Sequence, residues 1–110
     1  MAALGLIEVF GFATSIVVAD AAAKAGDVTI VALDKNKPAA GDAAEVPLIM
    51  VVKIEGDVAA VEQAVEAGTS VAKEKGLFIL SHIIANEADD TKKMAVISAV
   101  GHDKFNVLEY

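Results

Sequence analysis

The chain has 110 residues, which suits one domain rather than two. Its hydrophobic content of 55% excludes a disordered chain, and the absence of Cys excludes disulfides, a thiolate nucleophile and Cys-bound metal. Nine Lys and no Arg stand against sixteen Asp plus Glu, and this net charge of −7 disfavours nucleic acids and anionic membranes as partners.

Two strands around one helix are predicted for the first part of the chain. Residues 3–10 read as a strand, and the Ala-rich residues 12–25 favour a helix. Gly26 follows Lys24, which is the expected helix stop, because a cation suits the last turn and Gly tolerates the left-handed conformation. The β-branched run at residues 28–33 predicts a buried second strand.

Hydrophobic periodicity then stops, and residues 34–46 predict an irregular, solvated loop. The loop is long for a connection in a compact domain, and loops of this length are usually functional or disordered. A flexible surface connection and a binding or pore-lining segment are both open at this point. The residues that mark the loop are Asp34, Lys35, Asn36, Lys37, Pro38, Gly41, Asp42 and Glu45.

The second part of the chain continues with a strand, a helix and a strand. Residues 48–54 predict the third strand, and a helix then starts after Gly56, with Asp57 as its N-cap, and ends at Gly76. Residues 77–84 predict the fourth strand. The order β-α-β-β-α-β is that of the ferredoxin-like split βαβ motif. The predicted fold is therefore α+β, with a four-stranded antiparallel sheet and both helices on one face.

A different segment follows the fourth strand. Glu87, Asp89 and Asp90 form an acidic cluster without the ligand spacing of a hard-cation site, so we interpret it as a solvated helix N-terminus. Either aspartate can cap a short helix that extends to Val100, before a mixed tail. The two parts predicted for the chain are a domain of residues 1–88 and an extension of residues 89–110.

The sequence contains no complete catalytic set. It has no P-loop, and Gly5 and Gly11 do not form a dinucleotide fingerprint. Ser81 adjoins His82, but neighbours on a strand point to opposite faces, which excludes a nucleophile–base pair. We therefore expect no enzyme activity, no cofactor and no metal. A small enzyme with a cleft around Glu8 and His82 stays as a minor alternative.

Four separated motifs agree with one fold plan. They are Ala-Leu-Gly-Leu-Ile-Glu at residues 3–8, Ala-Asp-Ala-Ala-Ala-Lys-Ala-Gly-Asp-Val at 19–28, Gly-Asp-Val-Ala-Ala-Val at 56–61 with Ala67-Gly68, and Ser-His-Ile-Ile at 81–84. In order and spacing, this set resembles the single-domain family of bacterial microcompartment (BMC) shell proteins. The resemblance implies a non-catalytic protein that forms cyclic hexamers, which tile edge to edge around enzymes and leave a central pore for small metabolites.

The resemblance also implies roles for individual residues. Lys24 and Asn86 would be contacts at the edge where hexamers meet. From physical chemistry alone, Lys24 is equally a surface Lys in the last turn of a helix, where the macrodipole favours a cation. The residues that would lie near the pore axis are Asp34, Lys35, Asn36, Lys37, Pro38, Ala39, Ala40, Gly41 and Asp42.

Two features depart from the family pattern. The family has a short, Gly/Ser-rich pore loop, whereas residues 34–46 are longer and carry two Lys and three acids, a sum of −1 per subunit. We expect a charged pore that is partly plugged or mobile, because the loop is longer and sixfold symmetry multiplies its charges. The family also follows its last strand with Pro-Arg-Pro-His, whereas residues 85–88 read Ala-Asn-Glu-Ala, which predicts a variant assembly.

The predicted protein is a cytoplasmic microcompartment shell component. Its expected partners are copies of itself, other shell proteins and the encapsulated enzymes. Lys24 is the first basic side chain, and no uncharged run approaches the ~20 residues of a membrane helix, so we expect neither a secretion signal nor a membrane span. The alternative from another class is a trimeric PII-like ferredoxin-fold regulator that binds a small effector.

Overall fold

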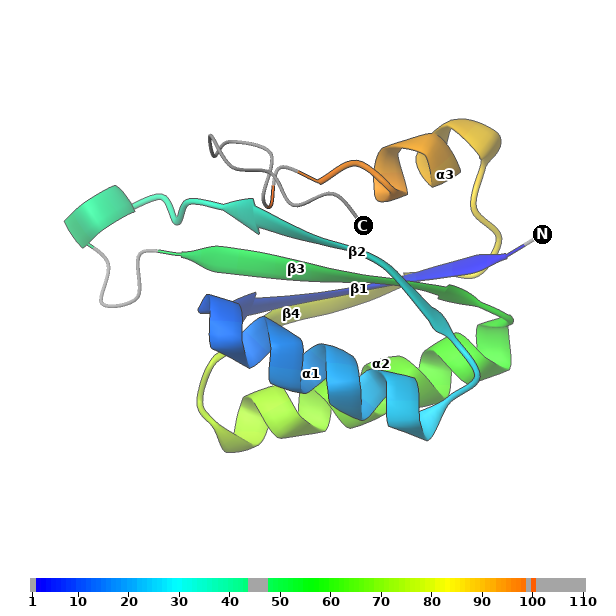
Figure 1. The fold of residues 1–110 in the computed structure, drawn as a ribbon, viewed down its shortest axis with the longest axis horizontal. Helices are drawn as coiled ribbons and strands as arrows, with labels where there is room; N and C mark the ends of the chain where they lie inside the picture. The colour runs from blue at the N-terminus through cyan, green and yellow to red at the C-terminus, as the bar shows by residue number, and fades with distance from the viewer. Residues whose placement is uncertain (1, 44–47, 99, 101–110) are drawn as a thin grey trace, which may run out of the picture.

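A computed structural model of the chain describes residues 2–43, 48–98 and 100 (Figure 1). Four strands form an antiparallel sheet in the order β2-β3-β1-β4, and the two long helices cover one face of it. This arrangement confirms the predicted α+β fold with split βαβ order. The elements are β1 (Ala3–Phe10), α1 (Phe12–Ala25), β2 (Thr29–Asn36), η1 (Gly41–Ala43), β3 (Ile49–Gly56), α2 (Val58–Glu74), β4 (Phe78–Ile84) and α3 (Asp89–Ala95).

The core lies between the sheet and the helices α1 and α2. Ile7 on β1 and Val52 on β3 are fully buried and stand opposite each other in the register. Val18 of α1 and Val61 of α2 are also fully buried and belong to the same cluster. Burying one side chain of this size contributes about 1.5–3 kcal/mol, so this cluster holds both helices on the sheet.

Two glycines allow α2 to approach its neighbours closely. At Gly68 in α2, an added Cβ would lie 2.7 Å from Cδ1 of Ile7. At Gly26, after α1, it would lie 2.5 Å from the carbonyl oxygen of Ala60 in α2. Gly26 has φ −143° and ψ 156°, which is extended backbone, so the predicted left-handed cap is wrong. The position needs Gly because the backbone of α2 leaves no room for a side chain.

β2 is longer than the sequence predicts. The expected strand ended at residue 33, but pairing with β3 continues to Asn36, which stands opposite Ile49. β3 offers backbone partners to polar residues that show no strand periodicity of their own. The neighbouring strand therefore decides where β2 ends, as is common for β-structure.

The predicted short helix forms with different ends. α3 stops at Ala95 rather than near Val100, and Ala88 occupies its N-cap, so neither predicted end is correct. Asp89 and Asp90 instead lie in its first turn, where the macrodipole favours negative charge. The predicted tail beyond residue 100 lies outside the described residues.

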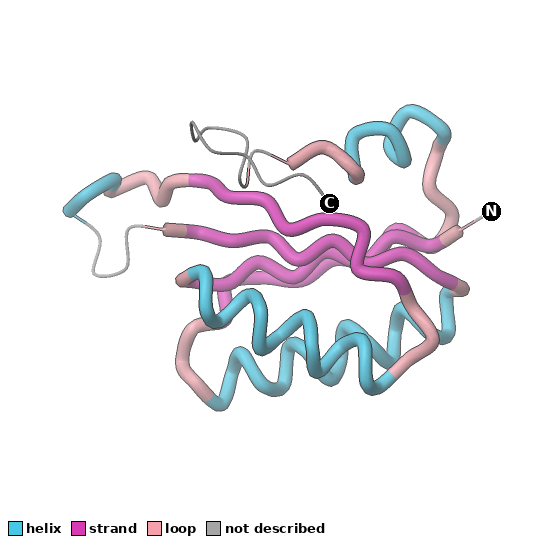
Figure 2. Tube along the Cα trace, in the orientation of Figure 1, coloured by secondary structure: helices cyan, strands magenta, loops and turns pink. Residues whose placement is uncertain are grey.

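α3 and its flanking residues form a third layer. They lie on the face of the sheet opposite α1 and α2, so the sheet is the middle layer (Figure 2). Before α3, the backbone N–H of Glu87 donates to the carbonyl oxygen of Ala2 at 3.1 Å. After α3, Nζ of Lys53 on β3 donates to the carbonyl oxygen of Ile97 at 2.7 Å. We call residues 85–98 the C-terminal strap, and the face that it crosses the helix-free face.

Candidate functional site

The predicted pore loop leaves the sheet at one end of the molecule (Figure 1). Residues 34–36 belong to β2. This part of the predicted loop is therefore regular strand, and the prediction of irregular structure is wrong for it. The part after β2 begins with a turn, in which the N–H of Gly41 donates to the carbonyl oxygen of Pro38 at 2.8 Å. Gly41 has φ +58°, a conformation that favours glycine. Glu45 lies outside the described residues. The exposed residues of the turn include Lys37, Ala39, Ala40 and Asp42.

Lys53 of β3 holds Asp34 against the sheet. Nζ of Lys53 and Oδ2 of Asp34 lie 3.4 Å apart, and their side chains are only 12% and 26% exposed. The sequence count of −1 for the loop included Asp34 but not this partner. With Asp34 balanced, the other charged side chains of the loop, two lysines and two acids, sum to zero. Sequence analysis missed Lys53, whose only signal is one cation in an apolar strand.

The two predicted edge residues are both exposed. Lys24 lies in the last turn of α1, as predicted, and its Nζ is 2.8 Å from Oδ2 of Asp20 one turn earlier. The hydrogen bond to Asp20, and then the charge of that carboxylate, raise the pKa of Lys24. The i,i+4 spacing is the sequence signal that could have identified Asp20. Asn86 lies in the bend that follows β4.

The candidate pore and edge residues lie toward opposite ends of the molecule. In Figure 1, η1 occupies one end of the longest axis, and the chain leaves α1 and β4 toward the other end. Lys24 is in the last turn of α1 and Asn86 follows β4, so both belong to that second end. The strands connect the two ends, because they run along this axis.

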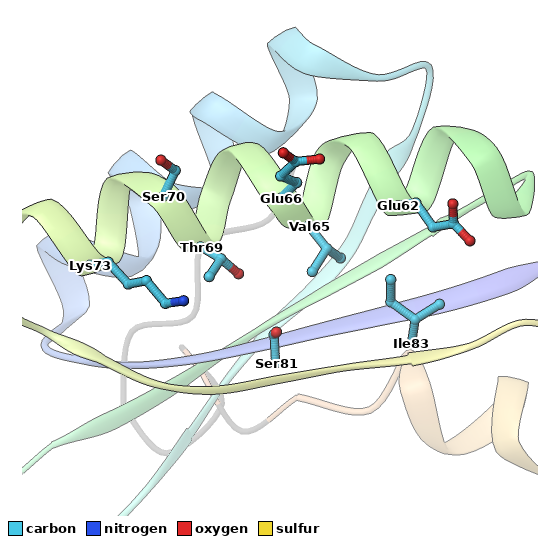
Figure 3. A pocket seen from close by; sticks show the side chains of 8 residues that line it. All are labelled: Glu62, Val65, Glu66, Thr69, Ser70, Lys73, Ser81 and Ile83. Atoms are coloured by element: carbon cyan, nitrogen blue, oxygen red, sulfur yellow. The ribbon is translucent and has the colours of Figure 1, made fainter.

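An open groove of about 380 Å³ runs between α2 and the edge strand β4 (Figure 3). Ser81 and Ile83 point from β4 toward α2, and Nζ of Lys73 also lies 5.2 Å from the centroid of the Phe78 ring. The groove mixes two acids, one Lys and three hydroxyl groups but has no His or Cys. The lining residues are Glu62, Val65, Glu66, Thr69, Ser70, Lys73, Ser81 and Ile83.

The register places the two residues of the minor enzyme alternative on the same face of the sheet. His82 stands opposite Leu6, and Glu8 stands opposite Leu80, so the two are diagonal neighbours on the helix-free face. Diagonal neighbours are about 7–8 Å apart, which is still within reach of long side chains. Within residues 2–43, 48–98 and 100, no group of three or more His, Asp or Glu could hold a metal ion. In the same ranges, no helix is both long and apolar enough to span a membrane.

Glu87 is not the solvated acid that the sequence predicts. It is only 3% exposed, because the strap folds back onto the sheet and places it beside Glu55 of β3. Burial first, and then Glu55, raise the pKa of Glu87 to about 7, against an opposing effect from Lys92. No local sequence pattern marks this contact, because the two glutamates belong to separate elements.

Comparison with known proteins identifies one family. The family model described as the BMC domain matches residues 3–87. Bacterial microcompartment shell protein PduK of Citrobacter freundii is 37% identical over 86 residues, which are 78% of this chain and 50% of that protein. Carboxysome shell protein CcmK3 of Halothece is 33% identical over 98 residues, 87% of each chain. Shell protein PduA of Citrobacter freundii is 32% identical over 92 residues, 84% of this chain and 89% of its own length.

A solved structure gives the same result. A microcompartment protein from Desulfitobacterium hafniense aligns with a TM-score of 0.69 and 37% identity, over 83% of this chain and 47% of that one. The chain spans about half the length of the PduK relatives that it matches, 50% and 49%. It spans most of the length of CcmK3 and PduA. All of these relatives are named as shell or microcompartment proteins.

Proposed function

The chain belongs to the BMC-domain family of microcompartment shell proteins, and from this premise we propose that six copies form a ring that tiles into a shell. The predicted pore loop, residues 34–42, would line a central opening for small metabolites. Lys24 and Asn86 would contact neighbouring rings. The role is structural rather than enzymatic, and its site is the bacterial cytoplasm, where copies assemble with other shell proteins around enzymes.

The position of the loop relative to the edge residues carries this proposal. A ring subunit needs one end at the axis and the other at the periphery. The predicted pore loop and the two edge residues lie toward opposite ends of the longest axis, as this geometry requires (Figure 1). A subunit with both sets at one end could not line a pore and tile outward at the same time.

The outer strands and α1 supply surface for the contacts within a ring. β2 pairs with β3 alone and β4 with β1 alone in the described part of the chain, so each outer strand has one open edge. Phe12 and Ile16 on α1 and Leu80 on β4 are 46%, 47% and 47% exposed. A ring closes by a head-to-tail contact between two different surfaces, which two opposite sheet edges can provide.

The ion pair of Asp34 changes the charge that we propose for the pore loop. Asp34 is balanced by Lys53 at 3.4 Å, so the other charged side chains of residues 34–46, two lysines and two acids, sum to zero. Sixfold repetition of two cations and two anions gives a ring without net charge. We therefore propose that the pore favours small polar metabolites with little preference for charge sign.

Native mass spectrometry of the purified chain tests the ring directly. The expected species is a hexamer that persists on dilution into the micromolar range. A monomer at high concentration would overturn the proposal. A stable trimer that binds nucleotides in calorimetry would favour the PII-like regulator instead.

A loop deletion tests the position of the pore. Removing residues 37–43 and joining the ends with two glycines leaves β2 intact, because Asn36 still pairs with Ile49. The ring should survive, and electron microscopy should show a wider central opening. Dissociation of the ring would place the loop in the subunit contact instead of at the axis.

A further inference from the structure

Two carboxyl groups from distant parts of the chain meet in a buried position. Leu4 of β1 stands opposite both Glu55 of β3 and Ile84 of β4. Where the strap leaves β4, only β1 therefore lies between it and the strand of Glu55. Glu87 lies three residues after Ile84 in the chain and is 3% exposed. Both carboxyl oxygens of Glu87 and Oε2 of Glu55 are buried, and they have no hydrogen-bond partner among residues 2–43, 48–98 and 100.

Two negative charges on this pair of carboxyl groups are energetically unfavourable. A buried carboxylate without a donor loses its hydration, and a second carboxylate beside it adds repulsion. One shared proton removes one charge and makes that carboxyl group a donor to the other. The same two causes, burial first and then Glu55, raise the pKa of Glu87 to about 7.

The surrounding charges do not neutralise the pair. Lys92 of α3 favours the ionised form of Glu87, but burial and Glu55 outweigh it. Lys53, two residues from Glu55 on the same strand face, is already bound to Asp34 at 3.4 Å and to the carbonyl oxygen of Ile97. On β1 the directly opposed side chain is the apolar Leu4, and on β2 it is Thr29. Two more titratable groups of this face are Glu8 and His82, on β1 and β4.

The pair lies where it can control the C-terminal strap. Glu87 precedes α3 directly, and its backbone N–H is bound to the carbonyl oxygen of Ala2. The other end of the strap is held by Lys53 and by the Ser98 hydroxyl, which donates to the carbonyl oxygen of Leu33. Between these two ends, only Ala95 is buried in α3. The strap therefore depends on few contacts, and loss of the Glu87 contact releases one of its two ends.

We propose that Glu55 and Glu87 form a proton-dependent latch that holds the C-terminal strap on the helix-free face of the sheet. The latch is closed while the two carboxyl groups share a proton, and it loosens when both ionise. The inference concerns a different face and different residues from the proposed pore, and it does not require the ring.

The sign of the pH dependence follows from linkage. The closed strap binds the proton more tightly than the open strap, whose glutamate has the ordinary pKa of 4.5. Stabilisation is therefore complete below that value, falls as pH rises, and is lost once pH passes about 7. One linked proton changes the opening equilibrium by up to about tenfold per pH unit in this window.

Amide hydrogen exchange of the intact protein tests the latch. Protection factors, corrected for the intrinsic pH dependence of exchange, are measured for residues 88–98 at about pH 5 to about pH 8. We expect protection to fall up to about tenfold per pH unit to near pH 7 and then to level off. Peptides from β1 and β3 should stay constant, because the sheet does not open. A wild-type profile without this fall overturns the proposal.

Conservative variants separate the latch from general pH effects. In Glu87→Gln the amide donates to Glu55 at every pH, so the strap should stay protected with a flat profile. Glu55→Gln should leave a smaller pH dependence, because burial still raises the pKa of Glu87 while the repulsion from Glu55 is gone, and it provides the test if the first variant folds poorly. Asp90→Asn is the matched control, because Asp90 is exposed and 3.7 Å from Lys93, and it should keep the wild-type profile. A pH-dependent profile in Glu87→Gln would refute the latch, and so would a profile in Glu55→Gln as steep as that of the wild type.

Discussion

Replacing Gly26 by Ala tests how closely the end of α1 approaches the backbone of α2. The backbone of Gly26 is extended, with φ −143°, and Ala adopts this conformation without strain. The cost is therefore steric. The new Cβ would lie 2.5 Å from the carbonyl oxygen of Ala60, whereas ordinary contact begins at 3.4 Å, so the two segments must separate by 0.9 Å (3.4 minus 2.5).

The magnitude follows from what is able to move. The obstructing atom belongs to the backbone of α2, so it cannot rotate away as a side chain would. Separating the helices also loosens the contacts of buried Val18 and Ala22 in α1 with the core. Overpacking typically costs 1–3 kcal/mol, and we expect Gly26→Ala to lower the free energy of unfolding by about 3 kcal/mol. For a domain of this size, this corresponds to a Tm decrease of roughly 12–24 °C.

Gly76→Ala provides the matched control. Gly76 has φ +70°, but nothing lies within 4 Å of an added Cβ, so this substitution carries only the conformational cost. That cost is about 1–2 kcal/mol. Comparing the two variants therefore separates steric contact from backbone conformation.

Urea unfolding followed by far-UV circular dichroism measures both variants. All samples need the same protein concentration, because association makes apparent stability concentration-dependent. The reasoning is refuted if Gly26→Ala stays within about 1 kcal/mol of the wild type, or if it is no more destabilised than Gly76→Ala.

Three further outcomes are expected. Ile7→Ala should lower the free energy of unfolding by about 2–5 kcal/mol in the same urea assay, because Ile7 is fully buried; a smaller loss would mean that the core collapses around the cavity. Lys24→Ala should leave the hexamer intact in native mass spectra but weaken the layers of tiled hexamers seen by electron microscopy. Asp20→Asn is the control, because it retains Lys24. Unchanged layers would exclude Lys24 from the ring edge. Lys53→Met should increase exchange at residues 96–98 about tenfold, because the carbonyl oxygen of Ile97 loses its donor, and unchanged exchange would show that Ser98 alone holds this end.

Most of the fold was predictable because its signals are local. The Ala-rich residues 12–25, the β-branched run at residues 28–33 and the glycines that punctuate the chain identified the helices and strands in the correct order. Errors occurred where contacts between elements outweigh local preference. β2 extends to Asn36 because β3 pairs with it, and Gly26 is required by the backbone of α2 rather than by a helix cap.

The candidate site, like the fold, could be predicted from the sequence only in part. The motifs led to the family, and the family model matches residues 3–87. The roles of Lys24, Asn86 and the pore loop stay predictions. Sequence analysis did not identify Lys53 as the partner of Asp34, because that pairing depends on the register between β2 and β3.

Runs of apolar and β-branched residues, together with glycine positions, are properties of neighbours along the chain, and they determined the order of elements, while four short motifs carried the resemblance to the family. Tertiary structure alone decided that Glu87, which the sequence presents as a solvated acid, is buried beside Glu55. The physical reason is the strand order. Only β1 lies between β3 and β4, so the start of the strap is close enough to β3 for Glu87 to fold back beside Glu55.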